Sequence, residues 1–151
     1  MPITAANRVL AQFWDNTIPV NPIVIAQRLG VNVMKNPSME YSGAYLIHEG
    51  VPTIVFNSSE SMTRQRFTVA HELGHHCLMH GTSFRDTSYS FNRHNYDPHE
   101  TEANNFATEL LMPELAVRHE SLRRTDLLLL SQAFDVSTVA MHIRLERLGI
   151  L

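Results

Sequence analysis

Residues 66–80 read RFTVAHELGHHCLMH and contain the pattern H-E-x-x-H, with His71 and His75 four positions apart. Residues four apart lie on one face of a helix, so both imidazoles can bind a single metal ion. Glu72 then lies beside the ion, where its carboxylate can take a proton from water. This is the arrangement of a zinc peptidase site. Since roughly 3–4% of shuffled chains of this composition would contain the pattern by chance, the surrounding sequence must decide.

The surrounding residues predict a helix. Asn57 is a candidate N-cap with Glu60 three positions later, the strongly helical part runs from about Thr63 to His80, and Gly81 ends it. Gly74 within this helix suggests close packing against a neighbour. One apolar stripe follows the 3–4 spacing of a helix: Phe67, Ala70, Gly74, Cys77 and Leu78. The alternative is a solvated helix face that happens to be rich in histidine.

A catalytic zinc site has three protein ligands and one open position. Residues 97–113 read DPHETEANNFATELLMP and predict a second helix, in which Asp97 is the N-cap and Glu100 its capping-box partner. Glu109 is either an exposed acid or a group that supports Glu102 from two turns away. Glu102 has no capping role, and we therefore predict it as the third ligand, the alternative being a surface carboxylate.

The two segments together, R-F-T-x-A-H-E-L-G-H-H and E-x-E-A-N-x-F-A-x-E-L-L-M-P, resemble the ImmA/IrrE family of bacterial and phage metallopeptidases. Residues 18–30 are similar to the N-terminal helix of that family, and residues 134–149 are similar to its closing helix pair. The resemblance implies that His71, His75 and Glu102 bind Zn²⁺ and that Glu72 is the general base. It also implies a short form, without the C-terminal sensor domain of longer members.

By the same resemblance, the chain is expected to be a zinc-dependent endopeptidase that cleaves or inactivates one cytoplasmic protein. The expected substrate is a helix-turn-helix (XRE-type) repressor of a mobile element, phage or stress operon. The alternative is a non-proteolytic toxin–antitoxin or regulator-binding module with a zinc site. A third hypothesis is a DNA-binding regulator with a vestigial site.

Composition limits these functions. The net charge is −3 and Lys35 is the single lysine, so there is no basic footprint for direct nucleic-acid binding. The chain has no apolar run long enough to cross a membrane and no signal-peptide pattern. Cys77 is the single cysteine and is interpreted as a packed helix residue; the lack of any disulfide pairing favours the cytoplasm.

The order of predicted elements favours an α+β fold. The family resemblance implies a mostly helical zincin-like domain with a small antiparallel sheet packed on the metal-binding helix. Helices are expected over residues 4–14 and 22–29, and a strand over 31–35. A hairpin is expected over 44–57, closed at Glu49-Gly50. One of its strands is either a purely structural strand or an edge to which a substrate peptide pairs.

The 151 residues are expected to form a single domain, 1–151. Its parts are residues 1–60 with the N-terminal helices and sheet, residues 61–112 with the metal-site helices, and residues 113–151 with the C-terminal helices. Residues 126–148 have the cadence of a helix-turn-helix, for which a core-completing or partner-docking role is favoured over DNA reading.

Residues 81–96 show no periodicity, and this long loop must pass near the site because it joins the two metal-bearing helices. Tyr89, His94 and Tyr96 are candidates for stabilising an oxyanion, although a solvated loop residue is the favoured interpretation of each one. On a continuous helix His76 and His80 would point away from His75, so neither is predicted to reach the metal.

Overall fold

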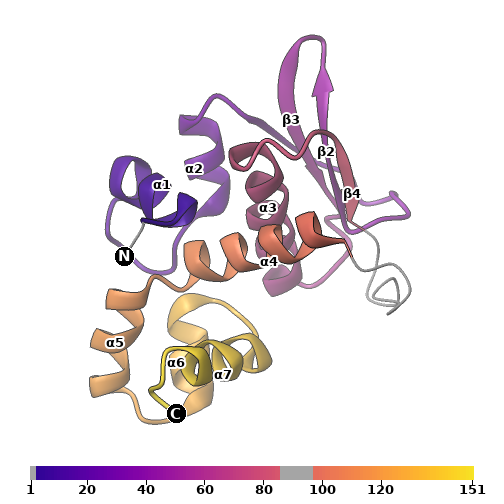
Figure 1. The fold of residues 1–151 in the computed structure, drawn as a ribbon. Coiled ribbons are helices and arrows are strands. Elements are labelled where there is room, and N and C mark those ends of the chain that lie inside the picture. Colours follow the sequence, from indigo (N-terminus) through magenta and orange to yellow (C-terminus); the bar gives the residue numbers. More distant parts are fainter. Residues whose placement is uncertain (1–2, 86–96) are drawn as a thin grey trace.

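Helices and a small sheet surround a central helix, α3 (Met62–Cys77), in the computed structural model, which describes residues 3–85 and 97–151 (Figure 1). This arrangement confirms the predicted α+β class. The other elements in chain order are α1 (Ala5–Phe13), α2 (Pro22–Arg28), β1 (Asn32–Lys35), β2 (Gly43–His48), β3 (Val51–Phe56), β4 (Ser83–Arg85), α4 (Pro98–Leu111), α5 (Glu114–Arg123), α6 (Leu127–Phe134) and α7 (Thr138–Arg147).

The sheet has the strand order β1-β3-β2-β4 among the described residues. The hairpin of β2 and β3 is confirmed, and its turn residues Glu49 and Gly50 both have positive φ, as a tight hairpin turn of this kind requires. The expectation of a purely antiparallel sheet is wrong, because β1 pairs with β3 in parallel. β3 lies between β1 and β2 and runs in the same direction as β1. The short strand β4 pairs with β2, and it lies in a segment that the sequence predicted to be a loop.

Helix α3 begins at Met62, one residue before the predicted Thr63, and ends before the predicted His80. Its N-cap is Ser61, whose hydroxyl accepts a hydrogen bond from the Arg64 N–H, and not Asn57. The Asn57 amide instead donates to the carbonyls of Met39 and Tyr41, so this residue holds the preceding loop. The helix ends at Cys77, three residues before the predicted end. Met79, two residues later, has a left-handed backbone conformation that a continuing helix does not allow.

The contact between α3 and α4 is close at one glycine, as the sequence suggested. A Cβ added at Gly74 would lie 3.1 Å from two Phe106 carbons and 3.2 Å from the Ala103 Cα. Ala103 and Phe106 are both buried. Any larger residue at position 74 would push α4 away, so this glycine sets how α4 lies across α3 and therefore which α4 side chains reach the histidines.

The sheet approaches α3 closely at Gly43 of β2. An added Cβ would overlap the Thr68 Cγ2 atom and lie 3.0 Å from the Val55 carbonyl oxygen. We expect Gly43→Ala to lower the free energy of unfolding by about 1–3 kcal/mol. The added methyl group would have to displace the Thr68 side chain and the Val55 carbonyl, and both are held in place by the packing of α3 against the sheet. Urea unfolding measures the effect. In a Thr68→Ser background the same substitution should cost less; an equal cost would contradict this packing account.

The C-terminal helices have the predicted helix-turn-helix pattern. Ser137 caps α7, and Asp135 in the turn has a left-handed backbone conformation. Arg66 of α3 holds this turn through hydrogen bonds to the carbonyls of Asp135 and Phe134, and it also donates to the Val20 carbonyl before α2. Arg144, which a DNA-reading helix would expose, is buried and donates to the Met112 carbonyl at 3.0 Å. The structure thus gives Arg144 a packing role. In the part of the chain that the structure describes, every helix is too short or too polar to cross a bilayer.

Candidate metal centre

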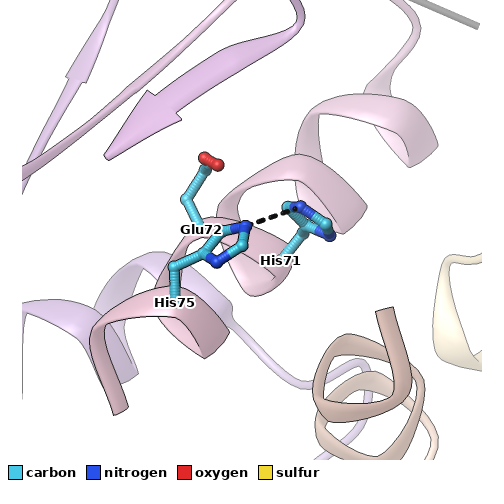
Figure 2. Close-up of side chains that lie close together, drawn as sticks. All are labelled: His71, Glu72 and His75. Carbon is cyan, nitrogen blue, oxygen red and sulfur yellow. Dashed lines mark hydrogen bonds between the residues drawn. The ribbon is translucent and has the colours of Figure 1, made fainter. Parts of the chain in front are cut away.

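Two buried histidines of α3 turn their rings toward each other. His71 and His75 are 0% and 1% exposed, and their Nε2 atoms lie 3.2 Å apart with the rings nearly perpendicular (Figure 2). They lie one turn apart on the helix, as the four-residue spacing predicted. Two imidazole nitrogens this close share a proton or face a cation, so the pair could form one side of a metal site.

The third group at this point is Glu100 of α4. Its Oε2 atom lies 3.0 Å from His71 Nε2, and its Oε1 atom lies 2.8 Å from His75 Nε2. The structure therefore places Glu100 beside the histidine pair, whereas Glu102, the predicted third ligand, contacts His80. Asp97 caps α4 by accepting from the His99 N–H, and the Glu100 carboxylate reaches across to α3 instead of serving the cap. Glu102 lies two residues farther, roughly 200° around the helix, on another side.

The surroundings of Glu100 favour its charged form. Partial burial alone raises the pKa of this carboxyl, but hydrogen bonds and charge interactions with His71 and His75 outweigh that effect and hold the pKa well below its usual range. The carboxylate is therefore ionised at neutral pH. It supplies the negative charge that a divalent cation in a buried site requires.

The arrangement of donors fits Zn²⁺. Two imidazole nitrogens and one carboxylate are the ligand set of many catalytic zinc sites. Bonds of about 2.1 Å in a tetrahedron place neighbouring ligand atoms roughly 3.4 Å apart, and the separations here are 2.8–3.2 Å. Small movements of the side chains would thus accommodate the ion, and three protein ligands would leave one position open.

Glu72 completes the H-E-x-x-H pattern. Its carboxylate and the two histidine nitrogens offer ligand-type atoms that all lie within 4.8 Å of one another. The side chain is fully buried and extends away from the helix, beside the two imidazoles (Figure 2). A carboxylate so close to the site, on the same helix as two of its members, is positioned to exchange a proton with a water molecule there.

Each of the two histidines has a partner on its second nitrogen. His71 Nδ1 donates to the Asn104 Oδ1 atom at 2.7 Å, since an amide oxygen can only accept. His75 Nδ1 lies 2.9 Å from the Nδ1 atom of His80, which contradicts the expectation that His80 points away. Neither Asn104 nor His80 was predicted from the sequence, although Asn104 follows Glu100 by one helical turn and that spacing was a usable signal.

The remaining predicted residues have other positions. His76 contacts the sheet, where its Nδ1 atom lies 2.6 Å from the Tyr45 hydroxyl, in agreement with the prediction that it meets a neighbour rather than the metal. Burial lowers the pKa of His76, which favours the neutral ring. The oxyanion candidates Tyr89, His94 and Tyr96 lie outside the described residues.

The structure narrows the hypothesis of a substrate-pairing strand. β3 is enclosed by β1 and β2, and the first half of β2 is covered by β4, whose register runs from Gly43 opposite Arg85 to Tyr45 opposite Ser83. Among the described residues, two candidate edges lie on this side of the sheet: the outer side of β4 and the second half of β2, residues 46–48. The opposite edge is β1. A peptide that paired with either would extend the sheet beside α3.

Cys77, the last residue of α3, is partly buried, and this burial raises the pKa of its thiol to about 11. We expect iodoacetamide to alkylate Cys77 about 100-fold more slowly in the folded protein than in urea at the same pH, because the thiolate fraction falls with this shift. Mass spectrometry over time measures both rates. Equal rates would contradict the packed environment.

Comparison with known proteins agrees with this site. Residues 26–146 match the Peptidase_M78 family, described as the IrrE N-terminal-like domain. Over 101 residues the chain is 35% identical to "Uncharacterized immunity region protein 2" of Bacillus phage phi105, an alignment that covers 64% of this chain and 61% of that protein. The chain thus spans about three fifths of the length of this curated relative.

Proposed function

The chain belongs to the IrrE N-terminal-like domain family of peptidases, as its resemblance to ImmA/IrrE proteins predicted, and we propose that it is a zinc-dependent endopeptidase. One observation carries the proposal: His71, His75 and Glu100 converge from two helices, with 2.8 and 3.0 Å between carboxylate oxygens and histidine nitrogens and 3.2 Å between the two nitrogens. These three residues would hold the zinc. Glu72, on the same helix as both histidines, would serve as the general base.

The residues divide the chemistry between them. Bound zinc supplies a Lewis acid that polarises the scissile carbonyl and makes water more acidic. The Glu72 carboxylate accepts a proton from the attacking water and then delivers it to the nitrogen of the leaving amine. Glu72 is fully buried, so its carboxylate meets little bulk water that would compete for that proton. Asn104 holds the His71 ring in the orientation that presents Nε2 to the ion.

The proposed substrate is a cytoplasmic regulator of the helix-turn-helix (XRE) type that represses a mobile element, phage or stress operon. The printed name of the phage relative refers to an immunity region, which supports a link to phage regulation. The same chemistry would suit cleavage of an antitoxin in a toxin–antitoxin pair. A specific partner also accords with a cytoplasmic protease that spares other proteins.

The experiment that tests the proposal uses the zinc-loaded protein and the helix-turn-helix regulators encoded beside its gene, with a proteome-derived peptide library in parallel. Mass spectrometry identifies new termini. We expect cleavage that a zinc chelator stops and that added zinc restores. Stable binding of a regulator by the zinc-loaded protein, with no new termini in either sample, would instead support a non-proteolytic regulator-binding module.

A further inference from the structure

Two further side chains, His80 and Glu102, extend a series of hydrogen bonds from the Nδ1 atom of His75. His75 Nδ1 lies 2.9 Å from His80 Nδ1, and His80 Nε2 lies 2.9 Å from an oxygen of Glu102. We propose that His80 and Glu102 are positioning residues, which fix the orientation of the His75 ring and thereby set the zinc affinity of the site. This inference rests on the proposed zinc site, but its geometry can be tested without zinc.

With zinc held by His75 Nε2, the hydrogen bonds beyond His75 would have only one consistent direction. The Glu102 carboxylate can only accept, so His80 Nε2 carries a proton and donates it. His80 Nδ1 would then be an acceptor, and His75 Nδ1 would donate to it. His75 Nε2, which faces His71 and Glu100, would carry no proton, the form in which imidazole binds a metal.

The end of α3 explains why a residue five positions after His75 can reach it. Met79 has a φ of 59°, the left-handed conformation that commonly closes a helix. The His80 N–H donates to the His75 carbonyl at 2.9 Å, and the Met79 N–H donates to the His76 carbonyl at 3.1 Å. This pair of bonds folds the chain back over the last turn, so the His80 ring lies beside His75 instead of continuing around the helix.

Packing holds the His80 ring in place. Its side chain is 5% exposed, and its ring stacks on His99 of α4, with 4.1 Å between centroids and 8° between planes. Glu102 is 54% exposed and approaches from the same helix. A ring clamped between α4 and the end of α3 has little freedom to leave its hydrogen bonds, which is what a positioning residue requires.

The two histidines of the site are supported differently. Asn104 offers His71 a neutral amide oxygen, whereas the series of hydrogen bonds from His75 ends at the Glu102 carboxylate. A terminal negative charge makes the imidazole a stronger donor to a cation, since it stabilises the positive charge drawn onto the ring. The structure thus gives Glu102 a role at the site through His80, although it does not approach the histidine pair itself.

The main test compares zinc affinity, measured by chelator competition, in His80→Ala, Glu102→Ala and the double variant. We expect each single change to weaken zinc binding by about 10–100-fold, and the double variant to be no weaker than the worse single one, because both break the same series of hydrogen bonds. Glu102→Gln should lose less, since its amide oxygen still accepts from His80. Wild-type affinity in the singles, or losses that multiply in the double variant, would overturn the proposal.

A matched control exists on α7, where His142 Nε2 pairs with Glu146 at 2.7 Å on the surface. His142→Ala and Glu146→Ala should leave zinc affinity unchanged. If Glu102 were instead a direct ligand, Glu102→Ala would weaken binding and His80→Ala would not, which also overturns the proposal. Thermal unfolding of the zinc-free variants establishes that each is folded.

Nitrogen NMR of the imidazoles in zinc-free protein gives a second readout. We expect the His75 ring-nitrogen signals to shift in His80→Ala, because the contact between the two Nδ1 atoms is lost. Unchanged His75 signals in His80→Ala would contradict the positioning role whatever the zinc affinity. If the wild type binds no zinc but the His75 signals shift as expected, the proposed function fails and the positioning contact stands.

Discussion

Glu72→Gln should reduce peptide-bond cleavage by about 10²–10⁴-fold, the usual contribution of a positioned acid–base group. Glutamine keeps the size of the side chain in a fully buried position but cannot accept the proton of the attacking water. His71, His75 and Glu100 remain in place, so zinc content and thermal stability should change little. The measurement is kcat for cleavage of an identified substrate, alongside zinc content.

Glu146→Gln, on the surface of α7, is the control and should retain wild-type turnover. If Glu72→Gln cleaved the substrate at the wild-type rate with zinc bound, Glu72 would not be the general base. Loss of zinc together with activity would mean that Glu72 supports the metal instead, and the division of roles proposed here would be incorrect.

Glu100→Ala should weaken zinc binding by more than the roughly 100-fold upper range expected for a residue that acts through a ligand. It removes a carboxylate with one oxygen at each histidine, and it leaves two imidazoles with no negative charge to offset the cation. Chelator competition on Glu100→Ala and Glu102→Ala side by side measures the difference between them.

Glu114, an exposed acid that pairs with Arg118 on α5, provides the control, and Glu114→Ala should bind zinc normally. The result that would contradict the structure is the reverse order, with Glu102→Ala losing more affinity than Glu100→Ala. That order would restore the assignment first made from the sequence.

The elements themselves were largely predictable because their signals are local. Ser137 caps α7, Asn21 caps α2 with its side chain, and Glu49-Gly50 close the hairpin, and each depends on residues within one turn. The two histidines of the H-E-x-x-H pattern lie on a single helix, so their spacing alone brings them together. His71 and His75 therefore lie side by side, as predicted.

The third group at the site was not predictable in the same way. Glu100 and Glu102 lie on one helix, and only the rotation of α4 on α3 decides which of them reaches the histidines. That rotation depends on the close contact of Gly74 with Phe106. The glycine suggested close packing, but no local pattern identified its partner. The capping-box reading of Glu100 was a reasonable local inference that the packing of two helices overrode.

His80 was misplaced for a related reason. A continuous helix puts it on another face, and the left-handed turn at Met79 brings it back. Non-glycine residues seldom adopt this conformation, so the sequence favoured Gly81 as the end of the helix. Parallel pairing of β1 and β3 likewise depends on where the hairpin inserts, and this long-range choice leaves no mark in either strand.

Elemental metal analysis of the purified protein, after incubation with zinc and removal of the excess, tests the proposed zinc site most directly. We expect about one zinc ion per chain in the wild type and a clear loss in Glu100→Ala, with both proteins folded. A folded wild-type protein that retains no zinc would contradict the metal site, and with it the proposed peptidase mechanism.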